Sequence, residues 1–124
     1  LAAISDLSKT DVYALAEWYN RSRGEEIIPQ NILLKEPSAE LAEGQMDPFD
    51  YNVVSPLVDE IVENKRNRKE LVHMGYDAVL VERISSLVRH AEFKRRQAAP
   101  GLRVTGKAFG MGRRYPIVNY FDND

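Results

Sequence analysis

The chain has 124 residues, of which 44% are hydrophobic and 29% charged, and its formal net charge at pH 7 is −2. This length and apolar content suit one globular domain and exclude a chain that stays disordered for want of a core. The sequence has no cysteine, which excludes disulfides, a thiol nucleophile and thiolate metal ligands. The longest apolar runs are much shorter than the roughly 20 residues that cross a bilayer, and no signal-peptide pattern is present, so we predict a cytoplasmic protein.

The charges are unevenly divided between the two halves of the chain. Residues 1–64 carry 13 acidic and 4 basic side chains, a net charge of −9, whereas residues 65–124 carry 6 acidic and 13 basic ones, a net charge of +7. A basic second half favours an anionic partner. The acidic first half argues against a protein that coats nucleic acid without specificity.

Helix signals dominate the start of the chain. Ser8 and Asp11 have the spacing of a helix N-cap and a first-turn acid. Apolar residues then recur at helical spacing as far as Gly24, which suits a C-terminal cap, so the pattern predicts a helix over residues 9–23. A proline at a first helical position predicts a second, short helix over residues 30–34.

The middle of the chain begins with an acidic segment that has no helical period. Residues 38–51 are therefore predicted to form a loop, and a loop of this length is often functional. Ser55 and Pro56 are predicted to restart a helix, because apolar residues again recur on one face after them. A further short helical piece is predicted to end at Gly75.

The last long helix is predicted to start after Asp77, another N-cap candidate. An apolar stripe with helical spacing continues from there into a basic cluster at residues 94–96, with a bend on the way. After Pro100 and Gly101 we expect an extended tail. No segment alternates as a strand would, so residues 1–124 are predicted to form a single, mainly α-helical domain.

Two basic features could bind an anion. Lys94, Arg95 and Arg96 stand at a predicted helix end and precede a glycine-rich basic segment, whose backbone N–H groups and arginines suit phosphate. The alternative is structural, because the helix dipole favours cations in a last turn. The other feature is Lys9, which stands between two hydroxyl residues at a helix N-terminus, where phosphates bind. Its alternative is plain capping.

Known catalytic and metal-binding motifs are absent from the sequence. His73 and His90 are 17 positions apart and have no partner at a metal-ligand spacing, so no metal site is predicted in this chain. The sequence also has no Gly-x-Ser-x-Gly elbow, Walker loop or dinucleotide fingerprint. Physical reasoning on single motifs therefore leads no further than an anion-binding helical domain.

Four groups of residues, taken in order, carry a resemblance to one enzyme family. They are Leu7-Ser8-Lys9-Thr10 with Val12-Tyr13; Ile28-Pro29 before Leu34-Lys35-Glu36-Pro37-Ser38-Ala39-Glu40; Ala91-Glu92-Phe93-Lys94-Arg95-Arg96-Gln97 with Pro100-Gly101; and a tail from Lys107-Ala108-Phe109-Gly110 to Arg114-Tyr115-Pro116-Ile117. This set resembles the C-terminal part of an NAD synthetase, and the tail is similar to that of the glutamine-dependent members. The resemblance covers nearly the whole chain.

The resemblance implies a place in a larger fold. The family's full domain is α/β and Rossmann-like, of the adenine nucleotide alpha-hydrolase (ATP pyrophosphatase) type, and this chain would be its mainly helical C-terminal segment. The family's Ser-Gly-Gly-x-Asp-Ser loop, its magnesium ligand and its glutaminase domain would lie upstream. Because the chain starts at Leu1 and contains none of these parts, we expect a fragment that is inactive alone.

The resemblance also implies a reaction and its participants. In the family, the carboxylate of nicotinic acid adenine dinucleotide (deamido-NAD) attacks the α-phosphorus of ATP, which gives an adenylated intermediate and pyrophosphate. Ammonia derived from glutamine then displaces AMP and leaves NAD. The implied cofactors are ATP and Mg²⁺, and the full enzyme is expected to be a homo-oligomer with no membrane or nucleic-acid partner.

Individual residues take roles by the same resemblance. Lys9 and Ser38 correspond to phosphate contacts of ATP, and Lys94 corresponds to a catalytic lysine at the reaction centre, where fixed cations stabilise developing negative charge. Three neighbouring positions are weaker candidates for substrate binding, namely Glu92, Phe93 and Arg95.

The acidic loop over residues 40–51 is similar to a mobile segment that closes over the family's site. Here the run Met46-Asp47-Pro48-Phe49-Asp50 departs from the family's usual pattern. No catalytic role is therefore assigned to Asp47 or Asp50.

Two other interpretations remain open. A helical module that uses the basic half to bind nucleic acid or a partner protein would bind oligonucleotides tightly and with steep salt dependence. A purely structural helical domain would lose only a little stability on mutation of the basic cluster.

Overall fold

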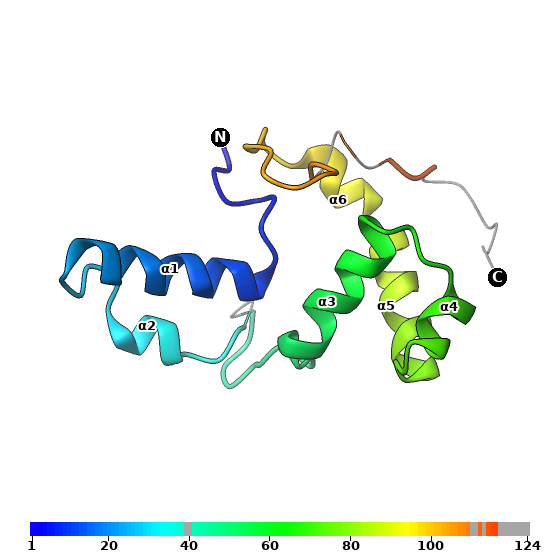
Figure 1. Ribbon diagram of the computed structural model, residues 1–124, viewed down its shortest axis with the longest axis horizontal. Helices are drawn as coiled ribbons and strands as arrows, with labels where there is room; N and C mark the ends of the chain where they lie inside the picture. Colours follow the sequence, from blue (N-terminus) through cyan, green and yellow to red (C-terminus); the bar gives the residue numbers. More distant parts are fainter. Residues whose placement is uncertain (39–40, 110–111, 113, 117–124) are drawn as a thin grey trace.

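The computed structural model in Figure 1 describes residues 1–38, 41–109, 112 and 114–116. Within those residues the chain forms α-helices and no strand, apart from one isolated bridge between Ala2 and Gly101. The helices are α1 (Lys9–Arg23), α2 (Gln30–Leu34), α3 (Tyr51–Val62), α4 (Arg68–His73), α5 (Ala78–His90) and α6 (Glu92–Gln97). The prediction of a mainly α-helical segment is confirmed.

The first two helices have the predicted bounds because strong local signals define their ends. Ser8 caps α1 by accepting a hydrogen bond from the backbone N–H of Asp11 at 3.2 Å. Gly24 ends α1 in the left-handed conformation, at φ 70° and ψ 16°, which a residue without a Cβ adopts readily. The side chain of Asn20 then accepts the backbone N–H groups of Ile27 and Ile28, which turns the chain back toward α2.

The predicted start of the third helix is wrong by four residues. The helix α3 begins at Tyr51, because Asp50 serves as its N-cap and accepts the backbone N–H of Asn52 at 2.9 Å. Pro56 therefore lies inside the helix and not at its start. Proline has no backbone N–H, so one carbonyl oxygen of the preceding turn lacks its usual hydrogen-bond donor. The predicted loop over residues 38–51 accordingly ends one residue earlier, at Asp50.

The remaining helices confirm the predicted order. A capping box of Asn67 and Glu70 starts α4, and Gly75, at φ 100°, follows its end. Asp77 caps α5 by accepting the backbone N–H of Leu80 at 2.8 Å. The predicted bend falls at Ala91, where α5 ends and α6 begins (Figure 1).

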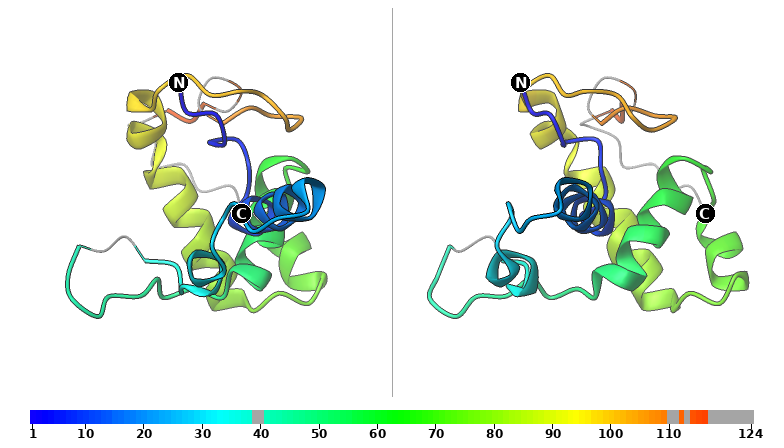
Figure 2. Two further views of the ribbon diagram at one scale, coloured as in Figure 1. Left: turned by 90° about the vertical axis from the view of Figure 1, so that its left-hand side faces the viewer. Right: turned by 60° about the vertical axis from the view of Figure 1, so that its left-hand side comes forward.

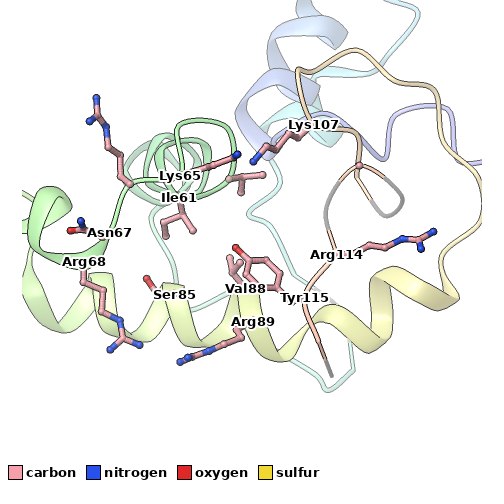
Figure 3. Close-up of a pocket in the computed structure, with 13 residues that line it drawn as sticks. Ile61, Lys65, Asn67, Arg68, Ser85, Val88, Arg89, Lys107, Arg114 and Tyr115 are labelled. Atoms are coloured by element: carbon pink, nitrogen blue, oxygen red, sulfur yellow. The ribbon is translucent and has the colours of Figure 1, made fainter. Parts of the chain in front are cut away.

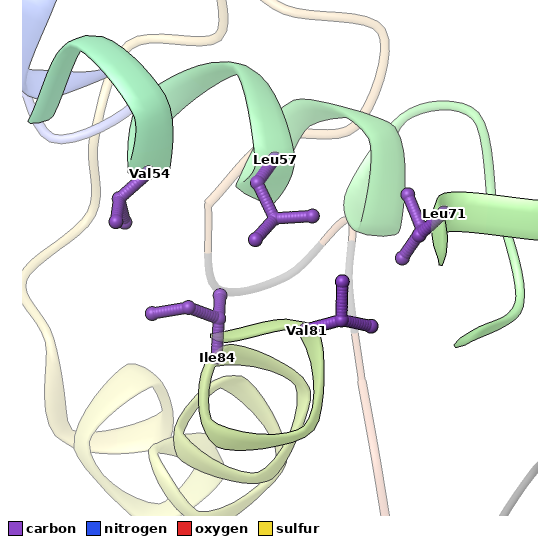
Figure 4. Close-up of a cluster of buried hydrophobic side chains, with 5 residues drawn as sticks. All are labelled: Val54, Leu57, Leu71, Val81 and Ile84. Atoms are coloured by element: carbon purple, nitrogen blue, oxygen red, sulfur yellow. The ribbon is translucent and has the colours of Figure 1, made fainter. Parts of the chain in front are cut away.

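The core is small and lies between α3, α4 and α5. Five apolar side chains are buried there and converge in Figure 4, namely Val54, Leu57, Leu71, Val81 and Ile84. In contrast, α1 buries none of its residues, and Figure 1 shows α1 and α2 extending to one side of the core helices. No helix in the described part of the chain is long and apolar enough to span a membrane.

The core predicts a contrast between two valines of the same helix. Val81 is 1% exposed and Val79 is 76% exposed. Val81→Ala removes two buried methyl groups and should lower the free energy of unfolding by about 2 kcal/mol, whereas Val79→Ala should change it by less than about 0.5 kcal/mol. Urea unfolding followed by circular dichroism measures both, and equal effects would contradict the position of the core.

Candidate functional site

The N-terminus of α1 presents a cation above a network of capping hydroxyls. The Ser8 hydroxyl lies 2.6 Å from Asp11 Oδ2 and 3.0 Å from the hydroxyl of Thr10, so both hydroxyls are engaged within the cap. Lys9 is exposed beside them. The capping interpretation of the hydroxyls is therefore confirmed, and Lys9 is the group of this turn that reaches away from the cap.

Lys9 lies over an aromatic ring at the start of α3. Its Nζ is 5.8 Å from the centroid of the Tyr51 ring, a cation–π distance. The Tyr51 hydroxyl donates a hydrogen bond to Asp47 Oδ2 at 2.6 Å. Burial, together with the hydrogen bond and the charge of Asp47, raises the pKa of Tyr51 to about 12. Tyr51 therefore remains protonated at neutral pH and holds Asp47 in place.

Ser38 lies on the other side of the same group of residues. The backbone N–H of Asp47 donates to the carbonyl oxygen of Pro37 at 2.9 Å, and the Ser38 hydroxyl donates to the carbonyl oxygen of Gln45. These bonds draw together the two ends of the acidic loop. Ser38 and Gln45 also line a hollow of about 520 Å³, with Lys35 at its rim. Through Tyr51 and Asp47, the structure brings Lys9 and the Ser38 segment into one cluster.

A buried carboxylate organises the side chains on one face of α6. Glu92 is 2% exposed and Arg95 6% exposed, and Arg95 donates from Nε and Nη2 to Glu92 Oε2 at 3.2 and 3.0 Å. Arg96 Nε donates to Glu92 Oε1 at 3.1 Å. Burial alone would raise the pKa of Glu92, but hydrogen bonds from Arg96, from the backbone N–H of Tyr115 and from Arg95 lower it below its ordinary value.

The same arginines fasten the tail to α6. Arg96 Nη2 donates to the carbonyl oxygen of Tyr115 at 3.2 Å, and the guanidinium of Arg95 lies 5.9 Å from the centre of the Tyr115 ring. The side chains of Glu92 and Arg95 are thus occupied by structural contacts. A substrate contact by either one stays a prediction.

Lys94 and Phe93 lie on the exposed side of α6. Phe93 is 48% exposed, and the Nζ of Lys94 is 6.0 Å from the centre of its ring. Lys94 belongs to α6, whereas Lys9 belongs to α1 and Ser38 to the loop that follows α2. The structure therefore brings two of the predicted site residues together and places the third on a separate helix.

The carboxylate of Asp6, which the sequence did not single out, connects the segment before α1 to the segment after α6. Asp6 Oδ2 accepts the backbone N–H groups of Val104 and Thr105 at 2.7 and 2.8 Å, and Asp6 Oδ1 accepts that of Phe109 at 2.5 Å. The N–H of Ala2 also donates to the carbonyl oxygen of Pro100 at 2.9 Å. Both views of Figure 2 show the N-terminal segment beside the segment that follows α6.

The described residues contain no group of three or more His, Asp or Glu side chains that could hold a metal ion. The magnesium ion that the family resemblance implies therefore does not fit a site built from the described residues alone. Parts of two groups that carried the resemblance, Ala39-Glu40 and the tail positions Gly110 and Ile117, lie outside the described residues.

Comparisons with known proteins agree on one family. A family model described as NAD synthase matches residues 1–98. The chain is 45% identical to a glutamine-dependent NAD(+) synthetase of Synechocystis sp. over 98% of its length, and 41% identical to that of Thermotoga maritima over 97%. It spans 22% and 21% of the length of these two relatives, about a fifth of each.

A solved structure has the same fold over the matched region. It is the glutamine-dependent NAD+ synthetase of Acinetobacter baumannii in complex with adenosine diphosphate, with a TM-score of 0.56 and 32% sequence identity. The match covers 96% of this chain and 21% of that one.

The hydrogen bonds of Asp6 predict an acid-sensitive tail. Burial would raise the pKa of Asp6, but its hydrogen bonds from the backbone and hydroxyl of Thr105 and from the backbones of Val104 and Phe109 lower it below the ordinary value of 3.8. A lowered pKa means that the stabilisation is present above that ordinary value and is lost as the pH falls through the pKa of the folded state. Asp6→Asn should remove this dependence.

Amide hydrogen exchange of Val104, Thr105 and Phe109 measures the effect. These amides should exchange faster in Asp6→Asn at pH 7, because the neutral amide accepts hydrogen bonds less strongly than the carboxylate. Asp50→Asn is the matched control, since asparagine also caps a helix and Asp50 lies far along the chain from the tail. Unchanged exchange in Asp6→Asn would contradict the proposed anchoring.

The buried ion pair of α6 predicts a second contrast. Glu92→Ala leaves Arg95 buried without its partner and should lower the free energy of unfolding by about 3 kcal/mol. Glu17→Ala removes a carboxylate from an exposed pair with Arg21, 3.5 Å away, and should change it by less than about 0.5 kcal/mol. Thermal and urea unfolding compare the two, and similar small losses would show that the pair does not anchor α6.

Proposed function

This chain belongs to the NAD synthase family, and on that premise we propose that it is the C-terminal segment of the synthetase domain of a cytoplasmic, glutamine-dependent NAD synthetase. The observation that carries the proposal is the 45% identity to one such enzyme over 98% of this chain. The parts that this segment would need, a nucleotide loop and a glutaminase domain, would lie in a portion of the enzyme that corresponds to the remaining four-fifths of its relatives. The segment alone would be inactive.

The proposed reaction is the ATP-dependent amidation of deamido-NAD to NAD. The nicotinate carboxylate attacks the α-phosphorus of ATP and expels pyrophosphate, which forms an adenylated intermediate. Ammonia released from glutamine then attacks the activated carbonyl carbon and expels AMP. Negative charge develops on phosphate oxygens in the first step and on an oxyanion in the second, so fixed cations lower both barriers. The enzyme would act as a homo-oligomer.

The cluster around Lys9 and Ser38 is proposed to bind the phosphates of ATP. Lys9 supplies a positive charge at a helix N-terminus, where backbone N–H groups also favour anions. Ser38 supplies a hydroxyl donor that would turn from the carbonyl oxygen of Gln45 to a phosphate oxygen. The related Acinetobacter baumannii enzyme was solved in complex with ADP, which supports a nucleotide site in enzymes of this family.

The acidic loop over residues 40–51 is proposed to close over the nucleotide. Both of its ends are tied, by the Asp47–Pro37 bond and by the Asp47–Tyr51 bond. Closure would therefore move the middle of the loop and leave its ends in place.

Lys94 is proposed to act at the reaction centre. Its neighbours Glu92 and Arg95 are buried against each other, so the backbone of α6 is held while the Lys94 ammonium stays exposed. A cation held in this way costs little reorganisation when charge develops beside it. Magnesium would be bound by residues upstream of this chain. The roles proposed for Lys9, Ser38 and Lys94 do not depend on its position.

Two lysine variants test these roles in the intact enzyme. Lys94→Ala should lower kcat by about 100-fold or more, because it removes a charge that acts in the transition state. Lys9→Ala should mainly raise the KM for ATP. Both side chains are exposed, so far-UV circular dichroism and the melting temperature should not change.

Lys69→Ala is the matched control, since Lys69 is an exposed lysine of α4 that belongs to neither cluster. Its NAD synthesis rate, followed with ATP, deamido-NAD and ammonia, should equal that of the unmodified enzyme. Near-normal rates in both Lys9→Ala and Lys94→Ala would overturn the assignment of the site.

A further inference from the structure

A second basic feature lies away from the proposed nucleotide cluster. A cavity of about 430 Å³ is bordered by the end of α3, the start of α4, the second half of α5 and the tail (Figure 3). Of the described residues that line it, six are basic and none is acidic. The basic residues are Lys65, Arg66, Arg68, Arg89, Lys107 and Arg114.

Some of the basic side chains that line the cavity are paired with carboxylates or extend away from it. Arg66 pairs with Glu60 at 3.6 Å and with Glu70 at 3.4 Å, and Arg68 pairs with Glu82 at 2.7 Å. Figure 3 shows the side chain of Arg114 extending away from the cavity. The Arg89 side chain likewise extends away from Lys65 and Lys107 in Figure 3. The ammonium groups of these two lysines are therefore the charges that an occupant between them would meet.

In the view of Figure 3, the ammonium group of Lys65, in the turn after α3, and that of Lys107, in the segment after α6, point toward one another. Two positive charges that face each other repel, and an anion between them turns the repulsion into attraction. No carboxylate lines the cavity among the described residues. The arrangement therefore favours an anionic ligand that both ammonium groups contact.

The backbone holds each of these lysines in place. Lys65 has φ 54°, the one positive φ of a non-glycine residue in the described chain, in a turn closed by the bond from the Arg66 N–H to the carbonyl oxygen of Glu60. The backbone N–H of Lys107 donates to Glu63 Oε1 at 3.0 Å. A disfavoured backbone conformation at a charged cavity is typical of binding sites.

The walls of the cavity set the size and type of the ligand. Ile61 and Val88 form apolar surface beneath the lysines, and Figure 3 shows the hydroxyl end of Tyr115 directed between them. Apolar walls exclude water and strengthen the attraction between charges. A volume of about 430 Å³ holds a single small molecule, whereas a nucleic acid requires an open groove.

We propose that this cavity is a second anion site that binds a small oligophosphate, a ligand with at least two linked phosphate groups. The two ammonium groups would contact different phosphates, since they belong to two separate segments of the chain. Lysine suits this role as a strongly charged donor to phosphate oxygens. None of Lys9, Ser38 and Lys94 lines the cavity, so the site stands apart from the proposed nucleotide cluster.

Isothermal titration calorimetry of the intact protein with inorganic pyrophosphate tests the proposal. The protein carries Lys9→Ala and Lys94→Ala in all titrations to weaken the proposed catalytic site, and the loss of affinity from this background to each cavity variant measures the contribution of the cavity. In this background, Lys65→Gln and Lys107→Gln should each weaken binding roughly tenfold, the loss expected for one hydrogen bond to a charged group. Lys69→Gln, which removes an equal charge from outside the cavity, should leave the affinity within about twofold.

Parallel titrations with ADP show whether the cavity prefers free pyrophosphate or the diphosphate of a nucleotide. Binding of pyrophosphate or ADP that is weakened by the two cavity variants, and not by Lys69→Gln, supports the site, and the tighter ligand identifies the source. Circular dichroism confirms that the glutamine variants are folded, and exposed lysines tolerate this change.

Three results would overturn the proposal. They are no saturable binding of either ligand by the background protein, equal weakening by Lys69→Gln and by the cavity variants, and displacement of pyrophosphate by a single-stranded oligonucleotide that binds tightly with steep salt dependence. The last result would show that the basic half is a nucleic-acid surface. All three leave the test of Lys9 and Lys94 by NAD synthesis unaffected, so failure here is distinct from failure of the proposed function.

Discussion

The carboxylate of Asp6 links the two regions of the proposed site, the cluster around Lys9 and Ser38 and the helix α6 that carries Lys94. It gathers three backbone N–H groups from the tail, at separations of 98 to 103 residues along the chain. Asp6 stands two residues before the N-cap of α1, and the tail follows α6 directly. Together with the hydrogen bond from the Ala2 N–H to the carbonyl oxygen of Pro100, this side chain joins the segment before the helix that bears Lys9 to the segment that continues from Lys94.

This anchoring matters because the apolar core does not supply it. The five buried apolar residues all belong to α3, α4 and α5, and α1 buries none of its side chains. Hydrophobic burial therefore stabilises the helical hairpin of α4 and α5 against α3, whereas polar contacts position the two ends of the chain. Polar contacts of this kind depend on charge state, which makes the region around Asp6 more sensitive to acid than the core.

Local signals explain what the sequence predicted correctly. The caps Ser8, Gly24 and Asp77 act on residues within one helical turn, so their effect can be predicted from the adjacent residues in the sequence. At α3 two local signals compete, and Asp50 starts the helix ahead of Pro56 because a side-chain cap stabilises a turn that a proline merely permits. The role of Asp6 could not be predicted, because no local pattern indicates which carboxylate will meet a segment about 100 residues away.

In α6, the spacing of the basic residues decides which of them pair with Glu92 and which stays exposed. Relative to Glu92, the arginines at 95 and 96 stand three and four positions on, which places them on the same face of the helix as the carboxylate. Lys94 stands two positions on, so it points to the opposite face. The buried carboxylate therefore selects the two arginines as anchors and excludes the lysine from pairing. For this reason the basic run is not one patch of equivalent cations, and its lysine is the member that the fold leaves available to a substrate.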